Sequence, residues 1–239
     1  MNNSILPKYL VAFMILALSS VFAINVVIYD RAYLYGENQL MEHTQILILL
    51  IVGNLFWLNT DSKKWQSVKQ SAPYLQLLAY LGAALCFSFI VREMNMKKSG
   101  IDWLIFFVDG HGYKILMALL WIPLLYKAYQ YKSEYIAIIK KGFLSQTSIF
   151  LAIAASLLLA GGLFDKEIIV VEYFRFYEEL LEMNGYGFML LAALSFRRDM
   201  IYAVCPSTHV AITVLEKEQL QLEKEKTEAD SRLNEQNGY

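Results

Sequence analysis

The chain has 239 residues and a net charge of −1; 57% of its residues are hydrophobic and only 18% are charged. A soluble domain normally carries about a quarter charged residues, so this composition is typical of a polytopic membrane protein. The near-neutral charge does not indicate a nucleic-acid partner. The two cysteines, Cys86 and Cys205, lack metal-type spacing and predict neither a metal site nor a disulfide framework.

Six apolar segments are long enough, or nearly so, to cross a hydrocarbon core of about 30 Å, which takes about 20 helical residues. A shorter stretch, IDWLIFFV at 101–108, predicts an interfacial helix because Trp and Phe suit the membrane boundary. We therefore expect an all-α integral membrane protein with a bundle of about six transmembrane helices. The predicted spans are 9–29, 41–58, 73–91, 113–129, 143–164 and 176–196.

The first span has a second interpretation, a cleaved signal peptide with Lys8 in its basic region and small residues in VFA at 21–23. Apolar character continues through 24–28, which favours a retained span. Lysine and arginine clusters follow one set of helix ends, as at 63–64, 140–141 and 197–198, and favour that side as cytoplasmic. Both termini are then cytoplasmic, and we expect a plasma membrane of the bacterial inner-membrane type.

Residues 1–198 form the predicted transmembrane domain, and residues 199–239 form a charged cytoplasmic tail. The tail mixes Glu and Lys at helical spacings, as in LEKEQLQLEKEK, which predicts a solvated helix that becomes disordered toward Tyr239. A partner protein could bind there. On the fifth span, Ala152, Ser156 and Ala160 are four residues apart and predict a close helix contact, with Gly161 and Gly162 loosening the outer end.

Ionisable residues gather at the predicted outer ends of the spans. Counting back from Arg197 at ~1.5 Å per residue places Glu182 ~21 Å from the inner surface, and therefore inside the outer leaflet. Other helices bring a carboxylate or a histidine to nearly the same level. The predicted outer cluster consists of Glu42, His43, Glu93, His111, Glu178, Glu179 and Glu182.

Charge inside a membrane helix is costly, so such a cluster indicates function unless the charges are paired. One hypothesis is a membrane-embedded enzyme that uses a divalent metal ion and acts on a lipid-like substrate at headgroup level, because carboxylates and histidines are metal ligands. A general base would activate a metal-bound water. The metal ligands would come from Glu178, Glu179, Glu182, His43 and His111, and the base would be Glu42 or Glu93.

Two further hypotheses remain open. A proton- or cation-coupled transporter or channel would use the same carboxylates, and Glu179 and Glu182 are close enough on one helix face to share a proton. That hypothesis lacks matching acids in the inner half. A non-catalytic membrane subunit would instead use the charges structurally, in ion pairs with Arg92, Lys114 or Arg175. No HExxH or CxxC motif favours the metal hypothesis.

Overall fold

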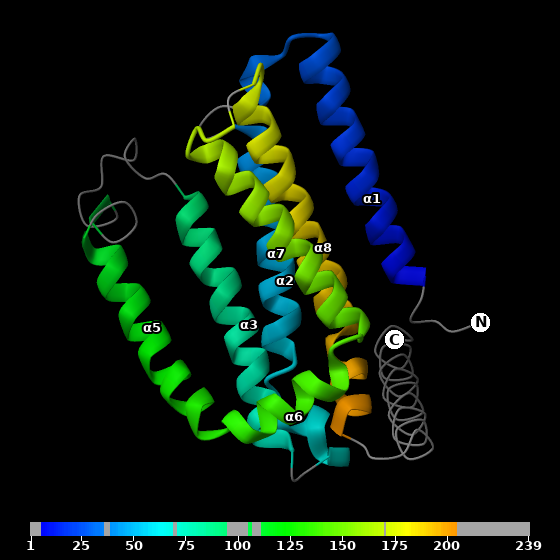
Figure 1. The fold of residues 1–239 in the computed structure, drawn as a ribbon, viewed down its shortest axis with the longest axis vertical. Helices are drawn as coiled ribbons and strands as arrows, with labels where there is room; N and C mark the ends of the chain where they lie inside the picture. Colours follow the sequence, from blue (N-terminus) through cyan, green and yellow to red (C-terminus); the bar gives the residue numbers. More distant parts are fainter. Residues whose placement is uncertain are drawn as a thin grey trace, which may run out of the picture.

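The computed structural model describes residues 6–35, 39–68, 71–94, 105–106, 111–169 and 171–204. All regular structure in these ranges is helical, and a helix occupies each of the six predicted segments (Figure 1). These helices are α1 (Leu6–Ala23), α2 (Leu40–Leu58), α3 (Ala72–Glu93), α5 (His111–Gln130), α7 (Gln146–Asp165) and α8 (Phe174–Val204). Only residues 105 and 106 of the predicted interfacial helix fall inside the described ranges.

Four helices are long and apolar enough to cross a membrane. They are α2, α3, α7 and α1 together with the π-helical turn that extends it, η1 (Ile24–Ile28). The helices α5 and α8 are long enough, at 20 and 31 residues, but their hydropathy and charge do not fit a span by composition alone. Pro123 lies inside α5, whose first and last turns carry Lys114 and Lys127, and α8 carries several glutamates. Four of the six predicted spans are thus helices that could cross a membrane by length and composition, which supports a membrane protein.

The helix α8 lies at the centre of the bundle. It packs against α7, α2, α1 and α6 (Lys132–Gly142), and most of its side chains are buried. An enclosed helix presents little surface to lipid, so it can carry polar residues that a lipid-facing helix cannot. Its 31 residues extend ~46 Å, which exceeds a hydrocarbon core of ~30 Å. It continues past Arg198, where we placed the end of the membrane domain, to Val204; the tail beyond lies outside the described residues.

Glycines bring α7 and α8 close together. A Cβ atom on Gly185 would stand 3.0 Å from the Leu158 side chain and 3.3 Å from the Ala154 carbonyl oxygen. Likewise, a Cβ on Gly161 would stand 3.1 Å from Cγ of Glu182. The face of α7 that meets α8 therefore carries residues 154, 158 and 161.

The predicted small-residue contact on α7 was wrong. Ala152 and Ser156 are exposed, and the Ser156 hydroxyl donates to the Ala152 carbonyl of its own helix. Spacing by four residues identified a stripe of small side chains, but it lies on the surface beside the stripe that packs. A run of small and apolar residues all around a helix gives no signal for which stripe faces its neighbour.

Two helices frame the bundle at its edges. Figure 1 shows α1 at one edge of the bundle, alongside α8, while α5 lies at the opposite edge beside α3. Trp121 of α5 donates its indole N–H to the hydroxyl of Ser88 on α3, at 2.9 Å. The short helix α6, which lies between the predicted spans 113–129 and 143–164, crosses one end of the bundle between α5 and α7 and buries Ile138.

Candidate functional site

An arginine connects the C-terminal end of α3 with the N-terminal part of α8. Arg92 is in the last turn of α3, and its Nη2 lies 2.7 Å from Oε1 of Glu93 and 2.7 Å from Oε1 of Glu182. The side chains of both glutamates are largely buried, at 9% and 7% exposure, whereas that of Arg92 is 46% exposed. One partly exposed guanidinium therefore forms ion pairs with two buried carboxylates.

Tyr186 completes this connection from the next turn of α8. Its hydroxyl donates to Oε1 of Glu93 at 2.7 Å and accepts from Arg92 Nη2 at 3.0 Å. The Phe89 ring packs against the ring of Tyr186 at a centroid distance of 5.5 Å and lies under the guanidinium of Arg92 at 5.6 Å. Arg92, Glu93, Glu182 and Tyr186 thus form one hydrogen-bonded cluster, which we call the arginine cluster. The Phe89 ring packs against it.

A second contact, between α2 and α8, lies one turn away. The side-chain amide of Gln45, which is fully buried, donates to Oε2 of Glu179 at 2.8 Å and to the Glu179 backbone carbonyl at 3.0 Å. Glu179 is itself only 6% exposed. Its carboxylate forms no ion pair with any described residue, so a neutral amide is its hydrogen-bond partner there. The other polar atom of this side chain, Oε1 of Gln45, is buried and has no hydrogen-bond partner among the described residues.

The remaining predicted site residues occupy different positions. Glu42 is half-buried on α2, close enough to Glu179 for their charges to interact, and Glu178 is half-buried on α8. His43 is exposed on α2, and His111 is the first residue of α5. Within the described ranges, no group of three or more His, Cys, Asp or Glu side chains is arranged to hold a metal ion. Among the described side chains, the glutamates lie near one another and the exposed His43 does not join them.

The loop before α8 also contacts the segment that follows α1 and η1. The Tyr173 hydroxyl donates to a carboxylate oxygen of Asp30 at 3.4 Å, and the adjacent negative charge raises the pKa of Tyr173. Both residues have positive φ, 61° for Tyr173 and 49° for Asp30, a conformation that is uncommon for residues with side chains. This contact lies outside the arginine cluster and holds the loop where the chain enters α8.

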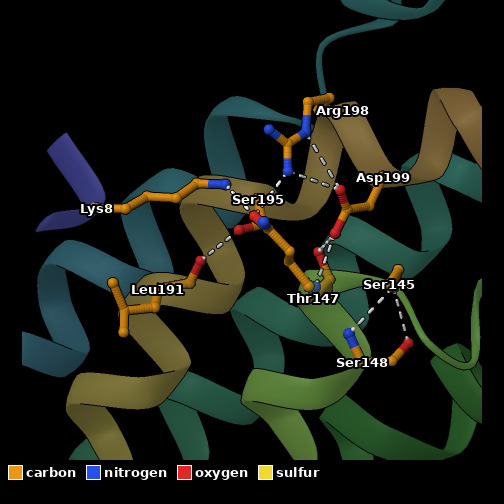
Figure 2. Close-up of polar contacts among 9 residues, drawn as sticks. Lys8, Ser145, Thr147, Ser148, Leu191, Ser195, Arg198 and Asp199 are labelled. Atoms are coloured by element: carbon orange, nitrogen blue, oxygen red, sulfur yellow. Dashed lines mark hydrogen bonds and ion pairs between the residues drawn. The ribbon is translucent and has the colours of Figure 1, made fainter. Parts of the chain in front are cut away.

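A buried carboxylate also lies near the C-terminal end of α8. Asp199 is 7% exposed, and its Oδ2 accepts hydrogen bonds from the backbone N–H and the hydroxyl of Thr147, at 2.7 and 2.9 Å (Figure 2). Thr147 is in the first turn of α7, so Asp199 satisfies an N–H that has no partner within that helix. Ser145 caps the same helix by accepting from the Ser148 backbone N–H. The central helix therefore carries buried acids at both ends.

Sequence reasoning missed three of these groups. Gln45 interrupts an apolar run three residues after Glu42, and Tyr186 follows Glu182 by four residues; both spacings place a polar group on the face of the acids. These signals were present in the sequence. Asp199 follows Arg197 and Arg198, where the sequence analysis placed the end of the last span, so nothing in the sequence distinguished it from a solvated tail residue.

Comparison with known proteins identified no relative. No family model matches the chain, and neither a curated protein nor a solved structure matches it.

Proposed function

We propose that this protein is a polytopic membrane transporter that couples its cycle to a small hard cation, such as a proton, bound by the buried acids of α8. The observation that carries this proposal is the placement of acids at both ends of the central helix. Glu179 and Glu182 lie near its outer end and Asp199 near its inner end, and all three are buried. Asp199 supports the proposal because it adds a buried acid toward the end of α8 where the sequence analysis had identified none.

In this proposal the bundle has six spans, with α5 and α8 added to the four apolar helices. Enclosure of α8 by α1, α2 and α7 supports this, because a helix that faces protein can span a membrane with polar residues. Both termini are cytoplasmic, in a plasma membrane of bacterial type. The arginine cluster then lies in the outer half and Asp199 at the inner boundary, ~25 Å apart along the helix.

Glu179 is the proposed cation-binding group. Its carboxylate lies outside the reach of the Arg92 bridges, and the adjacent Oε1 of Gln45 is a buried oxygen with no partner. Hard cations prefer such oxygen ligands. The half-buried Glu42 adds negative charge nearby. Glu182, in contrast, already has a guanidinium partner and is proposed to hold the helices in place while Glu179 binds and releases the cation.

The metal-dependent enzyme is the second candidate, because Glu42, Glu93 and Glu182 all lie close enough to Glu179 for charge interaction. Two observations weigh against it. The Arg92 guanidinium contacts the same oxygens of Glu93 and Glu182 that a metal would need, and it would repel a divalent ion. Glu93 Oε1 also accepts a hydrogen bond from Tyr186, and a carboxylate stabilised in this way is a weak general base.

Reconstituted vesicles provide the test. The full chain in liposomes with an internal pH-sensitive dye should carry protons when a membrane potential is imposed, and Glu179→Gln should abolish the flux. Glu172→Gln, which removes an exposed charge from the loop before α8, should leave it unchanged. If protein purified in mild detergent instead holds a stoichiometric transition metal that Glu182→Gln removes, and no flux occurs, the enzyme candidate replaces the transporter.

A further inference from the structure

A long apolar groove with a cationic end lies between α1, α7 and α8. Its cavity measures about 670 Å³. Ile15 of α1, Phe150 of α7 and Phe188 of α8 contribute apolar walls. The groove follows α8 from Asn184 to Arg198, which is ~21 Å of helix and exceeds the ~15 Å of one leaflet's hydrocarbon layer. A ligand that fills it must be long and mostly apolar.

Two cations meet at one end of this groove. Nζ of Lys8 and Nη2 of Arg198 each lie 2.7 Å from the same oxygen, Oε1 of Gln146, so the two charged nitrogens are at most twice that distance apart. Figure 2 shows Lys8 extending from α1 toward the part of α8 that carries Arg198. A neutral amide oxygen is the only group that Lys8 contacts among the described hydrogen bonds and ion pairs.

The nearest carboxylate does not balance both charges. Oδ1 of Asp199 lies 3.3 Å from Arg198 Nη2, while its Oδ2 accepts the two hydrogen bonds from Thr147. Lys8, Arg198 and Asp199 together therefore leave one positive charge at the end of the groove. Gln146 is the first residue of α7, so the positive end of that helix dipole adds to the charge.

We propose that this groove binds one anionic phospholipid. Its phosphate lies between Lys8 and Arg198, and one acyl chain follows the apolar walls toward Asn184. Paired cations at the end of an apolar cleft between membrane helices complement a lipid that carries negative charge on its headgroup. The volume is far larger than an inorganic phosphate requires. The groove is open at the surface, since its lining residue Tyr9 on α1 is largely exposed.

Lipid retention measures this binding. The full chain is reconstituted in nanodiscs of equal phosphatidylglycerol and phosphatidylcholine, released into mild detergent, and analysed by native mass spectrometry. We expect one phosphatidylglycerol to remain bound to the wild-type protein in preference to phosphatidylcholine. The Lys8→Gln, Arg198→Gln double variant should bind it at least about tenfold more weakly, because both phosphate contacts are removed. Lys140→Gln, Lys141→Gln removes two exposed charges from α6 and should retain the lipid.

A steric variant tests the groove without altering its charge. Ala12 is exposed and lines the groove, whereas Met14, on the same helix, is exposed but does not line it. Ala12→Trp should expel the lipid, and Met14→Trp should not. This pair decides the question even if the double charge variant fails to assemble. Equal retention of the two lipids by the wild type, retention of phosphatidylglycerol by Ala12→Trp, or occupation of the groove by a second copy of the chain would each overturn the proposal.

Discussion

Gln45 and Glu179 are joined by two hydrogen bonds from one amide group, to the carboxylate and to the backbone carbonyl of the same residue. Because Gln45 is fully buried, Gln45→Leu leaves two enclosed acceptors without their donor. We expect a loss of about 1–3 kcal/mol in the free energy of unfolding, which corresponds to several degrees in Tm. Thermal unfolding in mild detergent measures it.

The matched control for this variant is Asn54→Leu, on the same helix. Asn54 is exposed and donates only to the Leu50 carbonyl of α2, so its replacement should leave Tm nearly unchanged. Equal Tm values for the two variants would show that the contact between α2 and α8 contributes nothing to stability.

Arg92 should couple energetically to the acids it bridges. Arg92→Met leaves Glu93 and Glu182 enclosed without a cation, and we expect a destabilisation of about 1–3 kcal/mol, below the value for a fully buried pair because the arginine is partly solvated. Adding Glu182→Gln removes one stranded charge, so the double variant should be more stable than the sum of the two single effects implies. Urea- or heat-induced unfolding of the four proteins completes this cycle, and strict additivity would contradict the bridge.

Two adjacent glycines on α7 should respond in opposite ways to the same substitution. Nothing lies within 4 Å of a Cβ on Gly162, so Gly162→Ala should stabilise the protein by about 0.5–1 kcal/mol through helix propensity. A Cβ on Gly161 meets Glu182 at 3.1 Å, and Arg92 holds that side chain, so Gly161→Ala should lose this gain and lower Tm relative to Gly162→Ala. The reverse order would place the close approach of α7 and α8 elsewhere.

Sidedness is testable at the two ends of α7. Positions 141 and 167 both lie in exposed segments that flank this helix. In a Cys205→Ser background, whose other cysteine, Cys86, is buried, Lys141→Cys should react with a membrane-impermeant thiol reagent only after the cells are opened, and Glu167→Cys should react in intact cells. The reverse pattern would move the arginine cluster to the cytoplasmic side.

The positions of the helices followed from composition, but the stripe of each helix that packs did not. Runs of about 20 apolar residues located all six long helices because length and hydropathy are properties of a single segment. Which side of α7 meets α8 depends on the partner, so the stripe of Ala152 and Ser156 was chosen in error. The short helix α6 was missed because Lys132, Lys140 and Lys141 make it resemble a solvated loop.

The proximity of two of the predicted glutamates followed from the sequence, but their shared partner did not. Counting along the spans placed Glu93 and Glu182 at one depth, and the structure joins them through Arg92. Depth alone could not show that His43 is exposed, since neighbouring residues of a helix point about 100° apart. The partner of Glu179 could not be deduced from depth either. Gln45 is uncharged, and depth was considered only for ionisable residues.

Asp199 and Thr147 provide a further prediction, near the C-terminal end of α8. Thr147→Val removes the hydroxyl donor but retains the backbone donor, so we expect a loss of about 1 kcal/mol. Asp199→Leu removes the acceptor of both bonds and leaves a helix-terminal N–H buried, which should cost about 1–3 kcal/mol, with Asp199→Asn intermediate because its oxygen still accepts. Unfolding in detergent ranks the three variants. If Thr147→Val costs as much as Asp199→Leu, the hydroxyl rather than the backbone N–H is the important donor, and Asp199 does not act as the cap of α7.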